Sequence, residues 1–188
     1  MSISIDVRNQ WSKGYGPRDG VRLGTTGVGV KADHYTADGH NIVTRLTVAG
    51  VMPAVTGSLS VGLLAYTFPA GTHALKVARI NLALTAADGV IDADTPEIGL
   101  GDTIGSGANT GLNSVAASEN ILTGQAATNC SGTATDKAIL VPTSGHLVNE
   151  SGGTKTVYIN IADGWAGAEA ALPVSGEVWL EWTRFTSA

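Results

Sequence analysis

Residues 75–85 read Leu-Lys-Val-Ala-Arg-Ile-Asn-Leu-Ala-Leu-Thr and show the clearest strand pattern in this sequence. From Ala78 to Leu84 every second residue is apolar, which is the period of a β-strand with one buried face. Leu75 and Val77 fall on the opposite parity. A β-bulge near Val77, which inserts one extra residue, would bring both sets to one core. This stretch therefore predicts a long strand with a bulge.

The same period recurs elsewhere in the chain. Alternating apolar residues predict strands over residues 42–48, 157–161 and 178–182. The near-continuous apolar run of residues 59–68 predicts a strand that is covered on both sides. Pro96–Leu100 reads as a short strand, and its proline favours a sheet edge because proline lacks the N–H that an inner ladder needs.

Two weaker segments complete the secondary structure. Ala138–Val141 predicts a brief strand that stops before Pro142. Ser114–Leu122 predicts the best short helix, with Ser114 as its N-cap and Gly124 as its stop. The connections between these elements are long and irregular.

The composition agrees with short strands joined by many turns. Charged residues make up 14% of the 188 residues and glycine supplies 25, so neither a solvated helical bundle nor a disordered chain fits. Strands do not alternate regularly with helices, and no repeat indicates a solenoid or propeller. The expected fold class is all-β: an antiparallel β-sandwich, jelly-roll-like, with short helical turns. The predicted domains are an extended N-terminal arm over residues 1–35 and a β-sandwich over residues 36–188.

The first 35 residues differ from the rest of the chain in charge. They contain five basic and three acidic side chains, a local charge of +2, whereas the whole chain carries −5. A short alternating segment followed by glycine-rich turns favours an arm that reaches a neighbouring molecule. The alternative is an N-terminal strand folded back onto its own domain. The residues expected to contact a partner are Ile3, Ile5, Val7, Arg8, Lys13, Arg18 and Arg22.

The sequence contains no recognisable catalytic motif, and we expect no enzyme activity, no cofactor and no small-molecule substrate. An acidic chain lacks the clustered Lys and Arg that bind nucleic acid, and its longest apolar run is too short to span a membrane. A single cysteine, Cys130, and an N-terminus unlike a signal peptide indicate a soluble protein made in a reducing cytoplasm. The histidines are expected at surface or turn positions: His34, His40, His73 and His146.

Two features leave alternatives open. Five acidic residues from Asp88 to Asp102 are the best candidate for a calcium site. A solvated acidic turn, or a surface that faces a basic partner, is the simpler interpretation because their spacing matches no EF-hand loop. We therefore expect that folding needs no divalent metal. Trp179 and Trp182 lie on opposite faces of one predicted strand. One belongs in the core, and the other is a partly buried packing residue or a platform for a partner or a sugar ring.

Several segments between residues 40 and 185 resemble small virion structural proteins of tailed bacteriophages and their prophages. The resemblance lies in short strand and loop segments and includes no catalytic motif, so it implies no active-site residue. The segments are residues 41–51 (Asn-Ile-Val-Thr-Arg-Leu-Thr-Val-Ala-Gly-Val), 66–73 (Tyr-Thr-Phe-Pro-Ala-Gly-Thr-His), 93–101 (Ala-Asp-Thr-Pro-Glu-Ile-Gly-Leu-Gly), 119–125 (Glu-Asn-Ile-Leu-Thr-Gly-Gln) and 157–165 (Val-Tyr-Ile-Asn-Ile-Ala-Asp-Gly-Trp).

This resemblance implies a non-enzymatic protein that decorates or cements a capsid. Its implied partners are the major capsid protein and further copies of itself, and the threefold sites of a capsid lattice favour a trimer. Apolar residues on both faces of residues 59–68 and 178–185 also predict a closed homo-oligomer. The implied location is the capsid exterior of a virion that is assembled in the host cytoplasm. The alternatives are a tail or fibre component and a carbohydrate-binding jelly-roll module.

Overall fold

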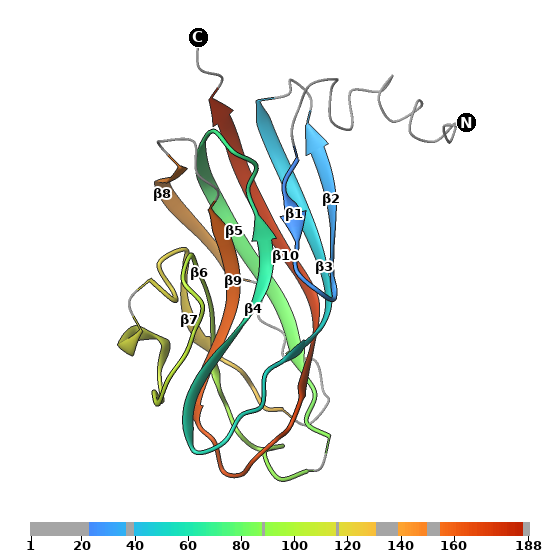
Figure 1. The fold of residues 1–188 in the computed structure, drawn as a ribbon, viewed down its shortest axis with the longest axis vertical. Coiled ribbons are helices and arrows are strands. Elements are labelled where there is room, and N and C mark those ends of the chain that lie inside the picture. Colours follow the sequence, from blue (N-terminus) through green and yellow to red (C-terminus); the bar gives the residue numbers. More distant parts are fainter. Residues whose placement is uncertain are drawn as a thin grey trace, which may run out of the picture.

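The computed structural model describes residues 23–36, 40–87, 89–115, 117–130, 139–149 and 155–185. They form two five-stranded antiparallel sheets that pack face to face (Figure 1). The sheet that we call sheet I has the strand order β1-β4-β9-β6-β7, and sheet II has the order β2-β3-β10-β5-β8. The fold is the all-β antiparallel sandwich that the strand periodicity predicts.

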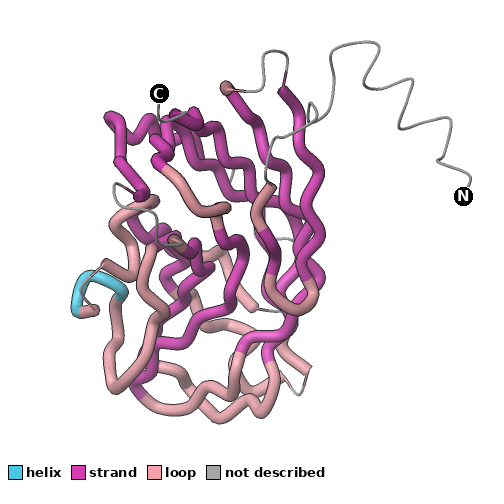
Figure 2. The backbone as a smooth tube through the Cα atoms, turned by 45° about the horizontal axis from the view of Figure 1, so that its top comes forward, coloured by secondary structure: helices cyan, strands magenta, loops and turns pink. Residues whose placement is uncertain are grey.

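Strands account for most of the described chain (Figure 2). Sheet I consists of β1 (Thr25–Thr26), β4 (Ser58–Thr67), β6 (Glu97–Gly101), β7 (Leu122–Ala126) and β9 (Thr156–Gly164). Sheet II consists of β2 (Val30–Thr36), β3 (Asn41–Met52), β5 (Thr72–Leu84), β8 (Ile139–Asn149) and β10 (Leu172–Phe185). Within the described ranges the helical structure is limited to one 3₁₀ turn, η1 (Leu112–Ser114).

The eight strands from β3 to β10 follow the winding of a jelly roll. β3 pairs with β10, β4 with β9, β5 with β8 and β6 with β7, all antiparallel, as in one long hairpin rolled around a core. The pairs β5–β10 and β6–β9 then join neighbouring turns of the roll within each sheet. Each outer face therefore combines residues from several distant parts of the chain.

Three strands of sheet II build the centre of the core. Leu46 of β3, Val178 of β10 and Ile80 of β5 are paired in one row across the sheet, and each side chain is at most 1% exposed. Alternate residues along all three strands are buried in the same way, so the predicted core face is confirmed. Burying each such side chain contributes about 1.5–3 kcal/mol to stability.

The bulge predicted in β5 is present at Lys76. Glu181 of β10 is opposite Val77, whereas the next residue, Trp182, is opposite Leu75, so Lys76 is the extra residue. The insertion turns Leu75 into the core, where it is fully buried. Val77 is only half-buried, so the bulge brings one of the two opposite-parity residues into the core rather than both.

Two predictions that were based on prolines are wrong. β6 lies between β9 and β7, so the strand that follows Pro96 is not an edge strand. Pro96 precedes β6, and its carbonyl accepts a hydrogen bond from Ala127 N at 2.7 Å, so the missing N–H does not interrupt a ladder. β8 continues past Pro142 because β8 is itself an edge of sheet II, the position at which sheets tolerate proline.

The helix predicted over Ser114–Leu122 is also wrong, because the described residues after η1 form a turn and bends until β7 begins. Ala117 has a φ of 63°, in the left-handed region, and the Ser118 hydroxyl donates to the Leu112 carbonyl at 2.8 Å. Thr103 N donates to the Ala117 carbonyl at 3.3 Å. These contacts with other parts of the chain override a weak helix propensity.

The sandwich begins earlier than the predicted boundary at residue 36. β2 pairs with β3 along its whole length, and β1 pairs with β4. The end of the predicted arm is therefore built into both sheets, as in the alternative of a strand folded back onto its domain. Residues 1–22 lie outside the described residues.

Candidate contact surface

One asparagine holds a loop over the outer face of sheet I. Asn160 of β9 points away from the core but is fully buried. Its Oδ1 accepts a hydrogen bond from Gly105 N at 2.8 Å, and its Nδ2 donates to Thr103 O at 2.9 Å and to Ser118 O at 2.6 Å. The loop of residues 102–118 is thereby fixed across the middle of this sheet.

Gly62 of β4 leaves the space that Asn160 and this loop need. A Cβ atom there would lie 2.3 Å from Asn160 Oδ1 and 3.1 Å from Gly105 N.

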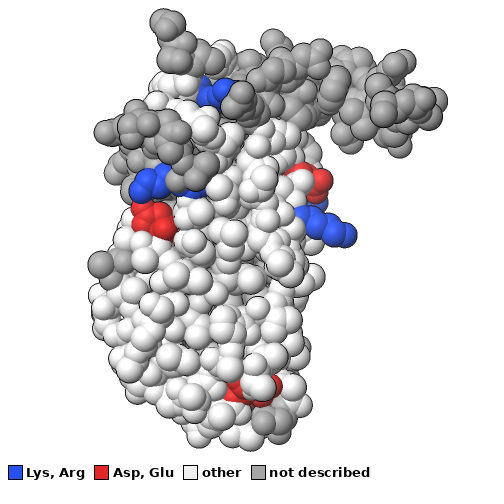
Figure 3. All heavy atoms as spheres, viewed as in Figure 1, with Lys and Arg blue, Asp and Glu red and all other residues white. Residues whose placement is uncertain are grey.

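The same side of the molecule carries little charge. The five strands of sheet I contain two charged residues, Glu97 and Asp163. Figure 3 views the molecule from this side and shows a broad surface without Lys, Arg, Asp or Glu.

The outer face of sheet II carries an aromatic and charged cluster. Trp179 of β10 is half-buried, and the guanidinium carbon of Arg45 on β3 lies 5.6 Å from its ring centroid. Glu177 Oε1 accepts hydrogen bonds from Arg45 Nε, at 3.0 Å, and from Arg45 Nη2. Glu177 Oε2 accepts from Trp179 Nε1 at 3.1 Å. We call these three side chains the Trp179 cluster; each of them holds the other two.

The electrostatics of this face favour charged side chains. Hydrogen bonds from Arg45 and then from Trp179 lower the pKa of Glu177, and the Glu177 carboxylate raises the pKa of Arg45. Arg79 of β5 and Glu181 of β10 form a second, looser ion pair at 3.4 Å on the same face. Solvent screens both pairs, so each adds little to the stability of the fold.

The pairing of three strands assembles this surface. Trp179 is opposite Arg45 on one side and opposite Arg79 on the other. Trp182 is 1% exposed, which confirms that the two tryptophans of β10 lie on opposite faces. The sequence alone does not single out Arg45 and Glu177, because they are 132 residues apart and only the register between β3 and β10 joins them.

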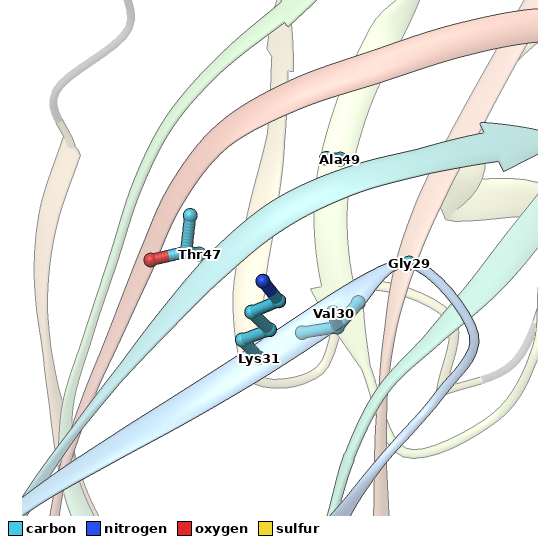
Figure 4. A pocket seen from close by; sticks show the side chains of 5 residues that line it. All are labelled: Gly29, Val30, Lys31, Thr47 and Ala49. Carbon is cyan, nitrogen blue, oxygen red and sulfur yellow. The ribbon is translucent and has the colours of Figure 1, made fainter.

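A pocket of about 290 Å³ opens at the β2 edge of the same sheet. Gly29, Val30 and Lys31 line it from the start of β2, and Thr47 and Ala49 line it from β3 (Figure 4). Lys31 and Thr47 are opposite each other in the ladder. The side chains of Lys31 and Thr47 therefore lie next to each other on the outer face of the sheet.

His73 is buried, so the expectation of a surface position is wrong for this residue. It is fully buried against the rings of Phe68 and Trp182, at centroid distances of 5.8 and 5.0 Å. Neither ring nitrogen has a hydrogen-bond partner among the described residues. Burial, and next the charge of Arg184, lowers the pKa of His73 and favours its neutral form. The shared parity with Leu75 was the signal for this inward position.

The other histidines are divided between core edge and surface. His34 is half-buried with its Nδ1 3.0 Å from Thr44 Oγ1, and burial lowers its pKa, so the surface expectation is wrong here too. His40 is exposed, as expected. The side chain of His146 lies outside the described residues.

The acidic segment is held by separate partners. Asp94 and Glu97 each accept a hydrogen bond from a backbone N–H, at 2.9 and 2.7 Å, and Asp102 pairs with Lys155 at 3.6 Å. Asp88 lies outside the described residues. Over the described ranges, no group of three His, Cys, Asp or Glu side chains is placed to hold a metal ion.

Cys130 is fully buried. Burial, with the nearby carboxylates of Asp94, Asp163 and Asp92, raises the pKa of its thiol to about 12. The thiol therefore stays protonated at neutral pH, and a protonated thiol is a poor nucleophile.

The expected partner contacts all fall in the N-terminal segment that the structure does not describe: Ile3, Ile5, Val7, Arg8, Lys13, Arg18 and Arg22. In the part of the chain that is described, no helix has the length and apolarity needed to cross a membrane. No family model matches the chain, and no curated protein or solved structure is similar to it at a significant level.

Proposed function

We propose that this chain is a non-enzymatic virion structural protein that decorates or cements the capsid of a tailed bacteriophage from the exterior. The observation that carries the proposal is the contrast between the two outer faces. Sheet II presents the Trp179 cluster and a second ion pair, whereas sheet I lies under its own loop and carries little charge. The resemblance of five segments between residues 40 and 185 to phage virion proteins supports the same role.

The Trp179 cluster has the chemistry of a protein contact. Aromatic residues and arginine are enriched in interfaces, because a ring or a planar guanidinium combines a large contact area with hydrogen bonds. The three side chains already hold one another, so binding would order few further groups. A rigid sheet that displays them suits the broad, repeated surface of a capsid.

The proposed partners are the major capsid protein and further copies of this chain. The family resemblance implies a trimer at the threefold sites of the capsid lattice, and the virion would be assembled in the host cytoplasm. The basic residues of the N-terminal segment would add contacts to acidic surfaces of adjacent subunits, so raising the salt concentration should weaken attachment.

Co-sedimentation with capsids that lack this protein tests the proposal. The wild-type chain should pellet with the capsids, and Trp179→Ala should weaken binding by at least about tenfold. Tyr158→Ala is the matched control, because Tyr158 is also half-buried and lies on the outer side of sheet I. A wild-type chain that stays in the supernatant would overturn the proposal.

A carbohydrate-binding module is the second candidate. It is favoured by the half-buried Trp179 ring with a carboxylate beside it, since sugar recognition combines an aromatic face with a few convergent polar groups. Glycan-array binding that Trp179→Ala abolishes, with no binding to capsids, would favour this function. Binding to isolated tails but not to heads would instead indicate a tail or fibre component.

A further inference from the structure

β2 is an edge of sheet II. It pairs with β3, and no other described strand lies on its second side. Ala49 N of β3 donates to Gly29 O at 2.7 Å, so the odd-numbered residues of β2 direct their backbone groups toward β3. A second hydrogen bond supports this assignment. Arg184 N of β10 donates to His40 O at 2.8 Å, so the even-numbered residues of β3 direct their backbone groups toward β10 and the odd-numbered ones toward β2. The backbone groups of Ala32 and the other even-numbered residues of β2 therefore point away from the sheet.

The outward side chains of this edge carry opposite charges two residues apart. Lys31 and Asp33 are exposed, and neither forms an ion pair with another described residue. Two copies of β2 can meet antiparallel about a twofold axis at Lys31, Ala32 or Asp33. A centre at Lys31 or Asp33 places like charges opposite each other. A centre at Ala32 places Lys31 of each copy opposite Asp33 of the other, so charge selects this register.

The geometry points to a twofold dimer in which β2 pairs antiparallel with β2 of a second copy, centred on Ala32, so that sheet II continues across both chains. Ala32 N–H and C=O bond to those of Ala32 in the second copy, and each His34 N–H donates to the opposite Val30 C=O. This gives about four backbone hydrogen bonds. The Lys31–Asp33 pairs fall at non-hydrogen-bonded positions, where facing side chains are closest.

The pocket beside Gly29 adds a second complementary feature. In this register Tyr35 of the second copy comes opposite Gly29, just beyond the paired residues. Tyr35 points outward and is 38% exposed, and the 290 Å³ pocket opens on the same outer face (Figure 4). A ring laid across an edge glycine covers the space left by its missing side chain. In the single chain the Tyr35 hydroxyl interacts with Arg45. In the dimer the Tyr35 side chain would leave this contact and rotate about χ1 into the pocket of the second copy.

This dimer is a property of the chain in solution and does not depend on the proposed capsid role. It differs from the trimer that the family resemblance implies. A lysine on an edge strand usually opposes edge-to-edge pairing, because its charge would be left without a partner. Here the second copy supplies the partner, Asp33.

Analytical ultracentrifugation of the full chain between about 1 and 100 µM tests the inference. The wild-type chain is expected to sediment at twice the chain mass. Lys31→Glu and Asp33→Lys should each weaken dimerisation by at least about tenfold, because each replaces two attractive pairs by two repulsive ones. The variant with both substitutions again has opposite charges facing each other, with the two positions exchanged. Its dimer dissociation constant should lie within about threefold of the wild-type value.

Two further variants locate the interface. Ala32→Pro removes an N–H that the β2–β3 ladder does not use, so it should abolish the dimer while a circular-dichroism melt shows a folded chain. Ala49→Arg fills the pocket and should weaken the dimer. Asn81→Arg is its matched control, because Asn81 is exposed on the same face but lies on β5, away from the edge.

A monomer over the whole concentration range, a trimer, or a dimer that Lys31→Glu leaves unchanged would overturn the inference. A double variant that stays as weak as the single variants would overturn the register. Failure of capsid co-sedimentation with an intact dimer would count against the proposed function and not against the pairing.

Discussion

The two sheets share one core but present opposite outer faces to solvent. On sheet I the loop of residues 102–118 lies across the strands and is held by the buried Asn160. On sheet II the outward residues of β3, β10 and β5 stay accessible and include Trp179 and two ion pairs. The inner faces therefore carry the stability of the sandwich, and the outer face of sheet II is available for contact.

Strand β10 shows the same contrast within four residues. Trp182 is buried, and its Nε1 donates to Thr44 Oγ1 at 2.9 Å, whereas Trp179 bonds to Glu177 on the surface. Residues of one type on one strand thus have different tasks because successive side chains point to opposite faces. The comparison predicts how strongly each position affects stability.

The largest effect is expected for Trp182→Ala. The substitution leaves a cavity beside Phe68 and His73 and removes the hydrogen bond from Trp182 Nε1 to the Thr44 hydroxyl. It should lower the free energy of unfolding by about 3–5 kcal/mol, as measured by urea denaturation. A loss below about 1 kcal/mol would show that this ring is not part of the core.

The next effect concerns the loop over sheet I. Asn160→Ala deprives Gly105 N, Thr103 O and Ser118 O of their partner and should destabilise the chain by about 2–3 kcal/mol. Thermolysin should then cleave the loop faster than in wild type. Asn81→Ala, at an exposed position of sheet II, is the control and should change neither property. An unchanged cleavage rate in Asn160→Ala would show that the loop is held by other contacts.

A smaller effect depends on pH. Burial lowers the pKa of His73 and of His34 below 6.5, so the unfolded chain binds their protons first and stability falls as the pH drops below 6.5. One histidine contributes a slope of at most about 1.4 kcal/mol per pH unit. His73→Leu should flatten this fall below pH 6.5. Constant wild-type stability over this range would contradict the prediction.

The smallest effect on stability is expected for Trp179→Ala. Its ring lies on the outer side of β10, so its loss opens no cavity in the core. The melting temperature should change by less than about 3 °C, although capsid binding should weaken strongly. A larger drop in melting temperature would mean that the Trp179 cluster is a structural element of sheet II rather than a contact surface.

Strand periodicity predicted the core well because its signal is local. The alternation in β3, β5, β9 and β10 and the bulge in β5 can be read from consecutive residues, since burial repeats every second position. The surface could be predicted only in part. Trp179 was recognisable as an outward aromatic residue, whereas its partners Arg45 and Glu177 depend on strand register.

The failures have one physical cause. The Ser114–Leu122 stretch has acceptable helix propensity, yet hydrogen bonds from Thr103 N to Ala117 O and from Asn160 Nδ2 to Ser118 O hold it as a loop. β6 became an inner strand and β8 an edge because the roll placed them there, which a proline in the sequence does not reveal. His73 was expected at the surface from its neighbouring glycine, but its parity within β5 turns it inward.

The sequence by itself determined that the chain forms strands, which side chains of the long strands are buried, and that few charges remain for the surface. These properties follow from local periodicity and composition. The tertiary structure alone decided which strands are neighbours, and hence that Arg45 and Glu177 meet Trp179, that a loop lies over Asn160, and that β2 is left as an edge. The physical reason is that pairing and sheet order depend on contacts between residues far apart in the chain, for which a single sequence carries no local signal.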